Sequence, residues 1–201
     1  MNKEPLIRKA RENEASDFYR LMAFSAKTLF PAIFGNRYKD ILMRLFSEER
    51  NLFSFRNCFF TEIDGKIAGM VLGYDWQLKK RQDFRTGMLI MKYMGPEFIK
   101  NIGLFLRVNN IIGWVDEGEY YISNIALYPE YRSMGIGARL MEKSEEEAKK
   151  AGAKRIGLDI EAENQKAARL YKKLGYSISG ATTAHLKGQK FEFHRMYKGL
   201  K

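Results

Sequence analysis

Apolar residues recur along the chain with two different periods, which predicts a mixture of helices and strands. A helical period of apolar side chains appears twice near the N-terminus, at residues 14–30 and 38–46. Two β-prone apolar segments follow, at residues 59–63 and 67–74, and Asp64-Gly65 separates them. An Asp-Gly pair between two such segments is typical of a β-hairpin, so we predict one here.

The remaining elements follow from the same periods and from the turn residues between them. Strands are predicted at 6–9, 120–127 and 155–161, helices at 136–151 and 164–174, and a closing hairpin at 177–184 and 189–197. Strands that alternate with helices in this way predict a mixed α/β fold. The length of 201 residues, without repeats or a linker, predicts one domain over residues 1–201.

The segment at about 77–114 is rich in methionine and other large apolar residues. We interpret it as a helical insertion that is broken at Gly95-Pro96, because this dipeptide interrupts a helix. Most of its apolar side chains, such as Met88 and Met91, are expected to pack in the core. Some of them could instead line a ligand pocket, because methionine adapts to irregular shapes.

The charge of the chain narrows its possible partners only partly. The formal net charge is +11, which favours an acidic partner such as a phosphorylated cofactor, a nucleic acid or an anionic surface. A lysine-rich, well-solvated exterior explains the same charge. The basic residues are scattered, and no aromatic–basic RNA motif accompanies them, so nucleic acid is not the expected partner.

Several classes of protein are disfavoured by residues that the sequence lacks. Cys58 is the single cysteine, so no internal disulfide is expected, and the two histidines are not spaced as metal ligands. We therefore expect no metal. Neither a signal peptide nor an apolar run of membrane-spanning length is evident. The expectation is a cytoplasmic protein without a membrane partner.

The most informative segment is Tyr131-Arg132-Ser133-Met134-Gly135-Ile136-Gly137-Ala138, which joins a predicted strand to a predicted helix. The first turn of a helix has unpaired N–H groups and a partial positive charge, and it binds anions. Glycines here let a phosphate approach the backbone. A Walker loop would need a Lys-Ser/Thr pair, and a dinucleotide fingerprint would need glycine where Leu140 stands. Glycines that only shape a turn are the remaining alternative.

This loop and its flanks resemble the GNAT acetyltransferase superfamily. The spacing Arg132-x-x-Gly135-x-Gly137 matches the family's pyrophosphate loop, and the stretch from Asn164 through Tyr171 matches its second signature, Asn-x-x-Ala-x-x-x-Tyr. The two signatures stand in the family's order and together cover about residues 120–176. The resemblance implies a twisted, mostly antiparallel central sheet of six to seven strands flanked by helices, and acetyl-CoA as the co-substrate.

The resemblance also implies which residues hold the donor. The loop would bind pyrophosphate mainly through backbone N–H groups, and the strand before it would offer backbone groups to pantetheine. Asn164 would add a side-chain contact. The implied donor-binding residues are Ala126, Leu127, Arg132, Ser133, Met134, Gly135, Ile136, Gly137, Ala138, Asn164, Ala167 and Tyr171.

The catalytic assignments are less complete. Tyr171 is the candidate general acid, because its position in the family lies near the cofactor sulfur and a phenol can protonate a thiolate; packing against the sheet is the alternative. Residues 121–124 carry no carboxylate, so the general base stays open. Asn124 or Ser123 could hold a proton-carrying water. Glu117, Glu119 or Glu161 could also act as the base through water, but each of them is expected to be a solvated charge.

The expected activity is therefore transfer of an acetyl group to a primary amine of a small molecule or a peptide. A non-catalytic acyl-CoA-sensing module is the alternative, because the missing strand carboxylate permits it. The acceptor is not identified by the sequence, and a homodimer is a further expectation.

Overall fold

The computed structural model describes residues 4–109, 113–186 and 188–201. Within them, seven strands form one sheet in the order β1-β2-β3-β4-β5-β7-β6. Neighbouring strands are antiparallel except for β4 and β5, which are parallel. The strands are β1 (Leu6–Lys9), β2 (Cys58–Ile63), β3 (Lys66–Asp75), β4 (Glu119–Leu127), β5 (Arg155–Glu161), β6 (Ser177–Leu186) and β7 (Gln189–Gly199).

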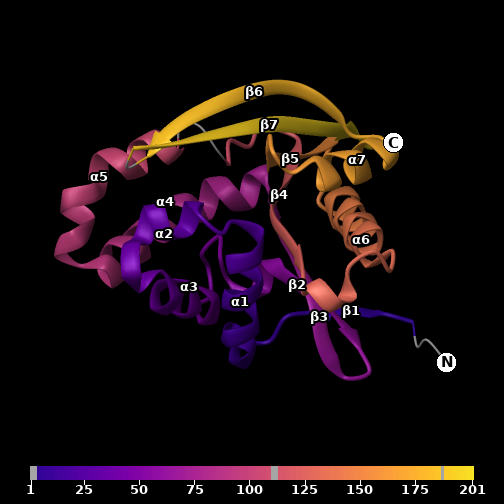
Figure 1. The fold of residues 1–201 in the computed structure, drawn as a ribbon, viewed down its shortest axis with the longest axis horizontal. Coiled ribbons are helices and arrows are strands. Elements are labelled where there is room, and N and C mark those ends of the chain that lie inside the picture. The colour runs from indigo at the N-terminus through magenta and orange to yellow at the C-terminus, as the bar shows by residue number, and fades with distance from the viewer. Residues whose placement is uncertain (1–3, 110–112, 187) are drawn as a thin grey trace.

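Helices cover both faces of this sheet (Figure 1). They are α1 (Ala15–Ser25), α2 (Leu29–Phe34), α3 (Tyr38–Ser47), α4 (Trp76–Met94), α5 (Pro96–Asn109), α6 (Ile136–Lys150) and α7 (Gln165–Lys173). One hydrophobic core packs the helices α1, α2, α3 and α4 against one face of the sheet. A second core packs α6 and α7 against the other face. The long hairpin of β6 and β7 arches from the α7 side toward α5 (Figure 1). The predicted mixed α/β fold with a mostly antiparallel sheet is confirmed.

The helix predicted at residues 14–30 is wrong, because two helices occupy this stretch. Helix α1 ends at Ser25, and the next residue, Ala26, has non-helical backbone angles. Helix α2 then starts at Leu29 and contains Pro31 in its first turn, where the missing N–H of proline removes no helical hydrogen bond. The break places Ser25 at the end of α1, where its hydroxyl accepts a hydrogen bond from Asn124 of β4.

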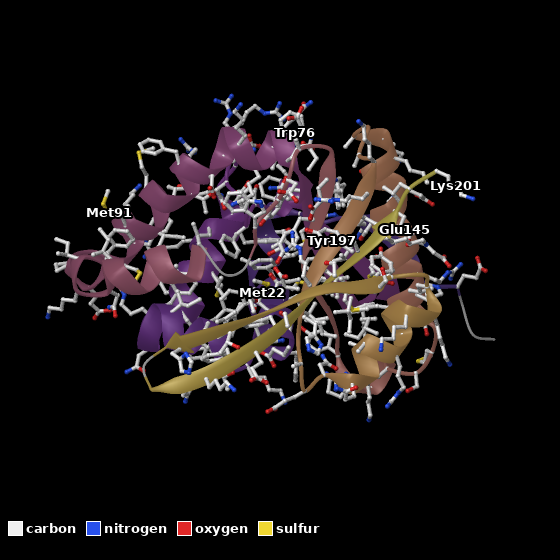
Figure 2. All side chains as sticks on the ribbon, turned by 90° about the horizontal axis from the view of Figure 1, so that it is seen from above. Met22, Trp76, Met91, Glu145, Tyr197 and Lys201 are labelled. Carbon is white, nitrogen blue, oxygen red and sulfur yellow. The ribbon has the colours of Figure 1, made fainter. Side chains whose placement is uncertain are left out.

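The segment predicted as a helical insertion is α4 followed by α5, and Gly95 separates them with a φ of 61°. Leu89 and Met94 are buried as expected, but Met88 and Met91 are 42% and 49% exposed. Figure 2 shows Met91 pointing away from the ribbon, whereas Met22 lies near the centre of the molecule. The expectation of core packing fails for these two methionines because only one side of α4 packs on α3 and the sheet.

A network of buried charges links β4, β5 and β7 at the ends of the strands. Arg195 on β7 contacts Glu119 on β4 at 2.8 Å and Asp159 on β5 at 2.7 Å. The Glu119 side chain is completely buried, so the expectation that Glu119 is a solvated charge is wrong. A buried carboxylate is tolerated only with compensating partners, and Arg155 provides a second one at 3.3 Å.

In the ranges that the structure describes, no helix has both the length and the hydropathy needed to cross a membrane.

We predict that Arg195→Met destabilises the protein by about 3 kcal/mol, because it leaves Glu119 and Asp159 buried without their shared cation. Urea unfolding, followed by circular dichroism, measures the loss. Arg37→Met is the matched control, because Arg37 and Asp40 form a 3.8 Å pair in which both side chains are about half exposed. The control should cost less than about 1 kcal/mol. Equal losses in the two variants would contradict a structural role for the network.

Candidate active site

The two parallel strands at the centre of the sheet separate before they end. The β4–β5 ladder runs from the pair Glu119–Arg155 to the pair Ile122–Leu158 and stops there. Strand β4 nevertheless continues to Leu127 and β5 to Glu161. Beyond Ile122, the edge of β4 that faced β5 therefore runs along a gap between the strands.

A β-bulge in β4 accompanies this divergence. On β3, Leu72 pairs with Asn124 and the next residue, Gly73, pairs with Ile122, so Ser123 is the extra residue. A bulge bends its strand and increases the local twist. The bulge thus lies at the point where β4 leaves β5, and it turns Ser123 and Asn124 toward the gap.

A cavity of about 110 Å³ fills the opening between the strands. Its walls come from the end of α1 and the start of α2, from β4 and β5, from Asn164 and Tyr171 at and within α7, and from Phe193 on β7. Three of the predicted site residues, Asn124, Asn164 and Tyr171, are brought together here although they come from different elements.

Tyr171 reaches the cavity from α7, and its side chain is only 5% exposed. Burial alone raises the pKa of its hydroxyl well above the usual 10. Its ring packs against Tyr176 at a centroid distance of 6.1 Å. Among the residues that the structure describes, none forms a hydrogen bond with the Tyr171 hydroxyl. Tyr171 lines the cavity, so its hydroxyl is available for a hydrogen bond to a molecule there.

Asn124 belongs to a short chain of polar groups on the cavity wall. Its amide nitrogen donates to the Ser25 hydroxyl at 2.8 Å, and its amide oxygen accepts from the Ser123 hydroxyl at 3.0 Å. Sequence reasoning missed Ser25, which is 99 positions away from Asn124 and was assigned to the middle of a helix. The three side chains form a fixed polar strip in which each group still has capacity for a further hydrogen bond.

Two carboxylates face the cavity from β5, and they differ in their surroundings. Asp159 accepts hydrogen bonds from the Tyr121 hydroxyl at 2.9 Å and from the Gly113 backbone at 3.1 Å, besides its ion pair with Arg195. Glu161 has no ion-pair partner in the described part of the chain. Burial, and then the charge of Glu163, raise the pKa of Glu161. The half-buried position of Glu161 departs from the expectation of a solvated charge.

The predicted phosphate loop leads from β4 into α6. Residues 132–135 are exposed, and both Ser133 and Gly135 have a positive φ, of 63° and 76°. Gly135 is the N-cap residue of α6, which has no side-chain cap. This leaves the first turn of a 15-residue helix open for an anion. Arg132 lies beside the loop and donates to the Leu127 carbonyl at 3.3 Å.

The two glycines of the loop are required for different reasons. Gly135 has open space around the position of a Cβ atom, so its left-handed backbone conformation is the reason for glycine. At Gly137 a Cβ atom would lie 3.3 Å from Leu170 of α7. Close packing of α6 against α7 therefore explains Gly137, in addition to the predicted approach of a phosphate.

The other predicted donor residues are arranged around the gap. Asn164 is the N-cap of α7 and accepts from the Ala167 backbone at 3.2 Å, which accounts structurally for its place in the second signature. The Ala126 side chain points into the core on the α1 side, and that of Leu127 packs toward α6 and α7. Both residues pair with β3, Ala126 with Met70 and Leu127 with Gly69, so the opposite edge of β4 at this point lies along the gap. Met134, Ile136 and Ala138 complete the loop and the first turn of α6.

No group of three or more histidine, cysteine, aspartate or glutamate side chains suited to a metal ion occurs among the described residues. The polar groups of the site are hydroxyls, amides and carboxylates on one side and an open helix N-terminus on the other. This arrangement can bind an anion at α6 and leave a buried phenol and a carboxylate next to the reacting end of a ligand.

Comparisons with known proteins agree with this geometry. The chain is 36% identical over 67 residues to a Bacillus subtilis (strain 168) protein provisionally named a ribosomal protein bS18-alanine N-acetyltransferase, covering 33% of this chain and 44% of that protein. It is 31% identical over 104 residues to an uncharacterised N-acetyltransferase of Methanocaldococcus jannaschii, covering 51% and 43%. The chain thus spans less than half the length of these curated relatives.

Solved structures share the whole architecture at low sequence identity. An N-acetyltransferase from Staphylococcus aureus Mu50 has a TM-score of 0.71 at 20% identity, covering 96% of this chain and 100% of that one. A Bacillus subtilis acetyltransferase in complex with CoA has a TM-score of 0.60 at 17% identity, covering 98% and 100%. The family model of the acetyltransferase (GNAT) family matches residues 23–176, more than half of the chain. The chain therefore belongs to the acetyltransferase (GNAT) family.

Proposed function

We propose that the protein is an acetyl-CoA-dependent N-acetyltransferase that transfers the acetyl group directly to a primary amine of a small molecule or a peptide. The observation that carries the proposal is the gap between β4 and β5. A cavity lined by Tyr171 lies at this gap, and β4 leads from it to the uncapped N-terminus of α6. Membership of the family supports the reaction class.

The site has the groups that acetyl-CoA requires. The N–H groups at the start of α6, from Ser133 to Ala138, would hold the pyrophosphate together with Arg132, because an open helix N-terminus favours negative charge. The unpaired edge of β4 at Ala126 and Leu127 would hydrogen-bond the amides of the pantetheine arm, as a neighbouring strand would. Asn164 and Ala167 would border the same arm at the start of α7.

Acetyl-CoA supplies a thioester whose carbonyl carbon is open to attack by an amine. As the new C–N bond forms and the C–S bond breaks, Tyr171 would give its proton to the departing sulfur. Because burial keeps its pKa well above 10, Tyr171 stays protonated throughout the working range of pH. Asn124, with Ser25 and Ser123, would hold a water that takes the proton released by the amine and returns one to Tyr171.

The competing proposal is a module that binds acyl-CoA without turning it over. The absence of a carboxylate from residues 121–124 of β4 favours it, since no residue of this stretch can act as a strong base. A panel of amines separates the two functions: n-butylamine, free alanine and a peptide with an N-terminal alanine, which the name of the bacterial relative suggests. Binding of acetyl-CoA without turnover of any of them would favour the sensing module.

We predict that Gly135→Glu weakens acetyl-CoA binding at least tenfold, a loss of about 1.4 kcal/mol in binding free energy. The new carboxylate would stand where the pyrophosphate is expected, and the left-handed φ of 76° adds backbone strain. Calorimetric titration measures the dissociation constant.

Gly152→Glu is the matched control, because Gly152 also has a positive φ, of 71°, and open space around a Cβ position, but follows the opposite end of α6. It should bind acetyl-CoA as the unmodified protein does. If both variants bind normally, the helix N-terminus is not the phosphate site.

We predict that Tyr171→Phe lowers kcat about a hundredfold, by removing the proton donor, without changing the dissociation constant of acetyl-CoA. Steady-state kinetics and titration measure the two effects. An unchanged kcat at every pH would remove Tyr171 from the mechanism.

The same variant should unfold at the same urea concentration as the unmodified protein, or a higher one, since its hydroxyl makes no internal hydrogen bond. Tyr176→Phe is the control: its hydroxyl donates to Glu145 of α6 at 3.2 Å, so its loss should cost about 1 kcal/mol and leave kcat unchanged. Figure 2 marks Glu145 on α6, well outside the cavity lining.

A further inference from the structure

The charged residues that line the cavity have the opposite sign to the net charge of the protein. The chain carries a formal net charge of +11, yet the residues that line the cavity include two carboxylates, Asp159 and Glu161, and no lysine, arginine or histidine. Side chains two positions apart on a strand point to the same face, so both carboxylates face α1 and α2 from β5. A low-dielectric pocket focuses the field of the charges that line it.

The two carboxylates are not equivalent, because only one of them is neutralised within the protein. Asp159 has an arginine, a tyrosine hydroxyl and a backbone N–H as partners. Glu161 is half-buried but lacks any ion-pair partner among the residues described. Burial raises the pKa of Glu161, and the charge of Glu163, another carboxylate, raises it further. A half-buried carboxylate without a cation is unfavourable in the empty protein and favourable once a cation binds.

A second polar group of the cavity, the Tyr171 hydroxyl, is available for a hydrogen bond to a ligand. Tyr171 as a residue is more than nine-tenths buried and lines the same cavity, and its hydroxyl has no hydrogen-bond partner among the described residues. Tyr171 belongs to the donor side of the proposed reaction, and Glu161 lies on the side of α1 and α2. A molecule between them would contact both.

The wall next to Glu161 is apolar. Phe193 is its neighbour across the β5–β7 ladder, and Ala26 and Leu29 line the cavity from the break between α1 and α2. These side chains can cover a hydrocarbon stem. These three side chains offer no donor to a carboxylate. The Asn124 amide of the lining has one N–H left to donate, but it carries no charge, and a carboxylate beside the amine would be repelled by Glu161.

On the basis of the proposed acetyl transfer, we propose that Glu161 binds the ammonium group of the acceptor. That ammonium would first release one proton to solvent through the water held at Asn124, so that the amine attacks the thioester in its neutral form. The acceptor is then a primary amine on an uncharged, largely apolar stem, without a carboxylate next to the amine. Alkylamines and lysine-like side chains belong to this class, whereas free α-amino acids do not. Glu161 is thereby a specificity-determining residue of the acceptor pocket.

The experiment uses n-butylamine and alanine as acceptors, and compares the unmodified protein with Glu161→Gln and the control Glu163→Gln. Gln keeps the shape of the side chain and removes its charge. Glu163 is exposed and two positions further along the chain. In Glu161→Gln the KM of n-butylamine should rise at least tenfold, as expected from loss of a charge-assisted hydrogen bond, while the KM of acetyl-CoA stays within twofold. In the unmodified protein, kcat/KM for alanine should be at least tenfold below that for n-butylamine.

A binding measurement keeps this test separate from the test of acetyl transfer. Titration of n-butylammonium into the protein saturated with CoA should give a dissociation constant that rises about tenfold in Glu161→Gln and not in Glu163→Gln. If no amine is acetylated but this difference is found, the proposed activity fails and the role of Glu161 stands. Equal affinities in the three proteins, no binding of n-butylammonium, or equal use of alanine and n-butylamine would overturn the proposal.

Discussion

The separation of β4 from β5 is the constraint on which the rest of the site depends. A sheet satisfies its backbone groups by pairing, and here the pairing of two central strands stops at Ile122 and Leu158 while both strands continue. The opened edge must find other partners, which are side chains such as Arg132 at the Leu127 carbonyl, or a ligand or water. Because α6 begins just beyond β4 and α7 just beyond β5, the same opening brings a helix N-terminus and Tyr171 to its two ends.

The charge network of Arg195, Glu119 and Asp159 lies where the opening between β4 and β5 begins, and it holds the paired part of these two strands together. Arg195 links β7 to both parallel strands, and Glu119 and Asp159 lie on either side of it. The ladder is held closed at Glu119, and Asp159 lies just past its last pair, at the mouth of the cavity. One cation therefore compensates a carboxylate needed for the fold and another that borders the site, which leaves Glu161 as the carboxylate free to interact with a ligand.

Local signals in the sequence predicted the donor half of the site because its chemistry is local. The Arg132 to Gly137 spacing, the strand before it and the helix after it are contiguous, and their physical meaning follows from glycine and helix-end properties. The acceptor half could not be predicted in this way. Asn124 meets Ser25 across 99 positions and Asp159 meets Arg195 across 36, so neither contact has a sequence signature. The break after Ser25 was also missed, since apolar spacing continues through it into α2.

The two halves differ in electrostatic sign, and this difference has a consequence for binding order. The donor end combines the helix dipole of α6 with Arg132 and attracts phosphate, whereas the acceptor end has Glu161 and repels it. In the proposed function, the cofactor would therefore bind with its anionic end at α6. Its neutral reacting end would then lie at the cavity and would exclude water there, which would strengthen the attraction between the proposed Glu161 site and an ammonium group. The proposed sites would thus favour binding of the donor before the amine.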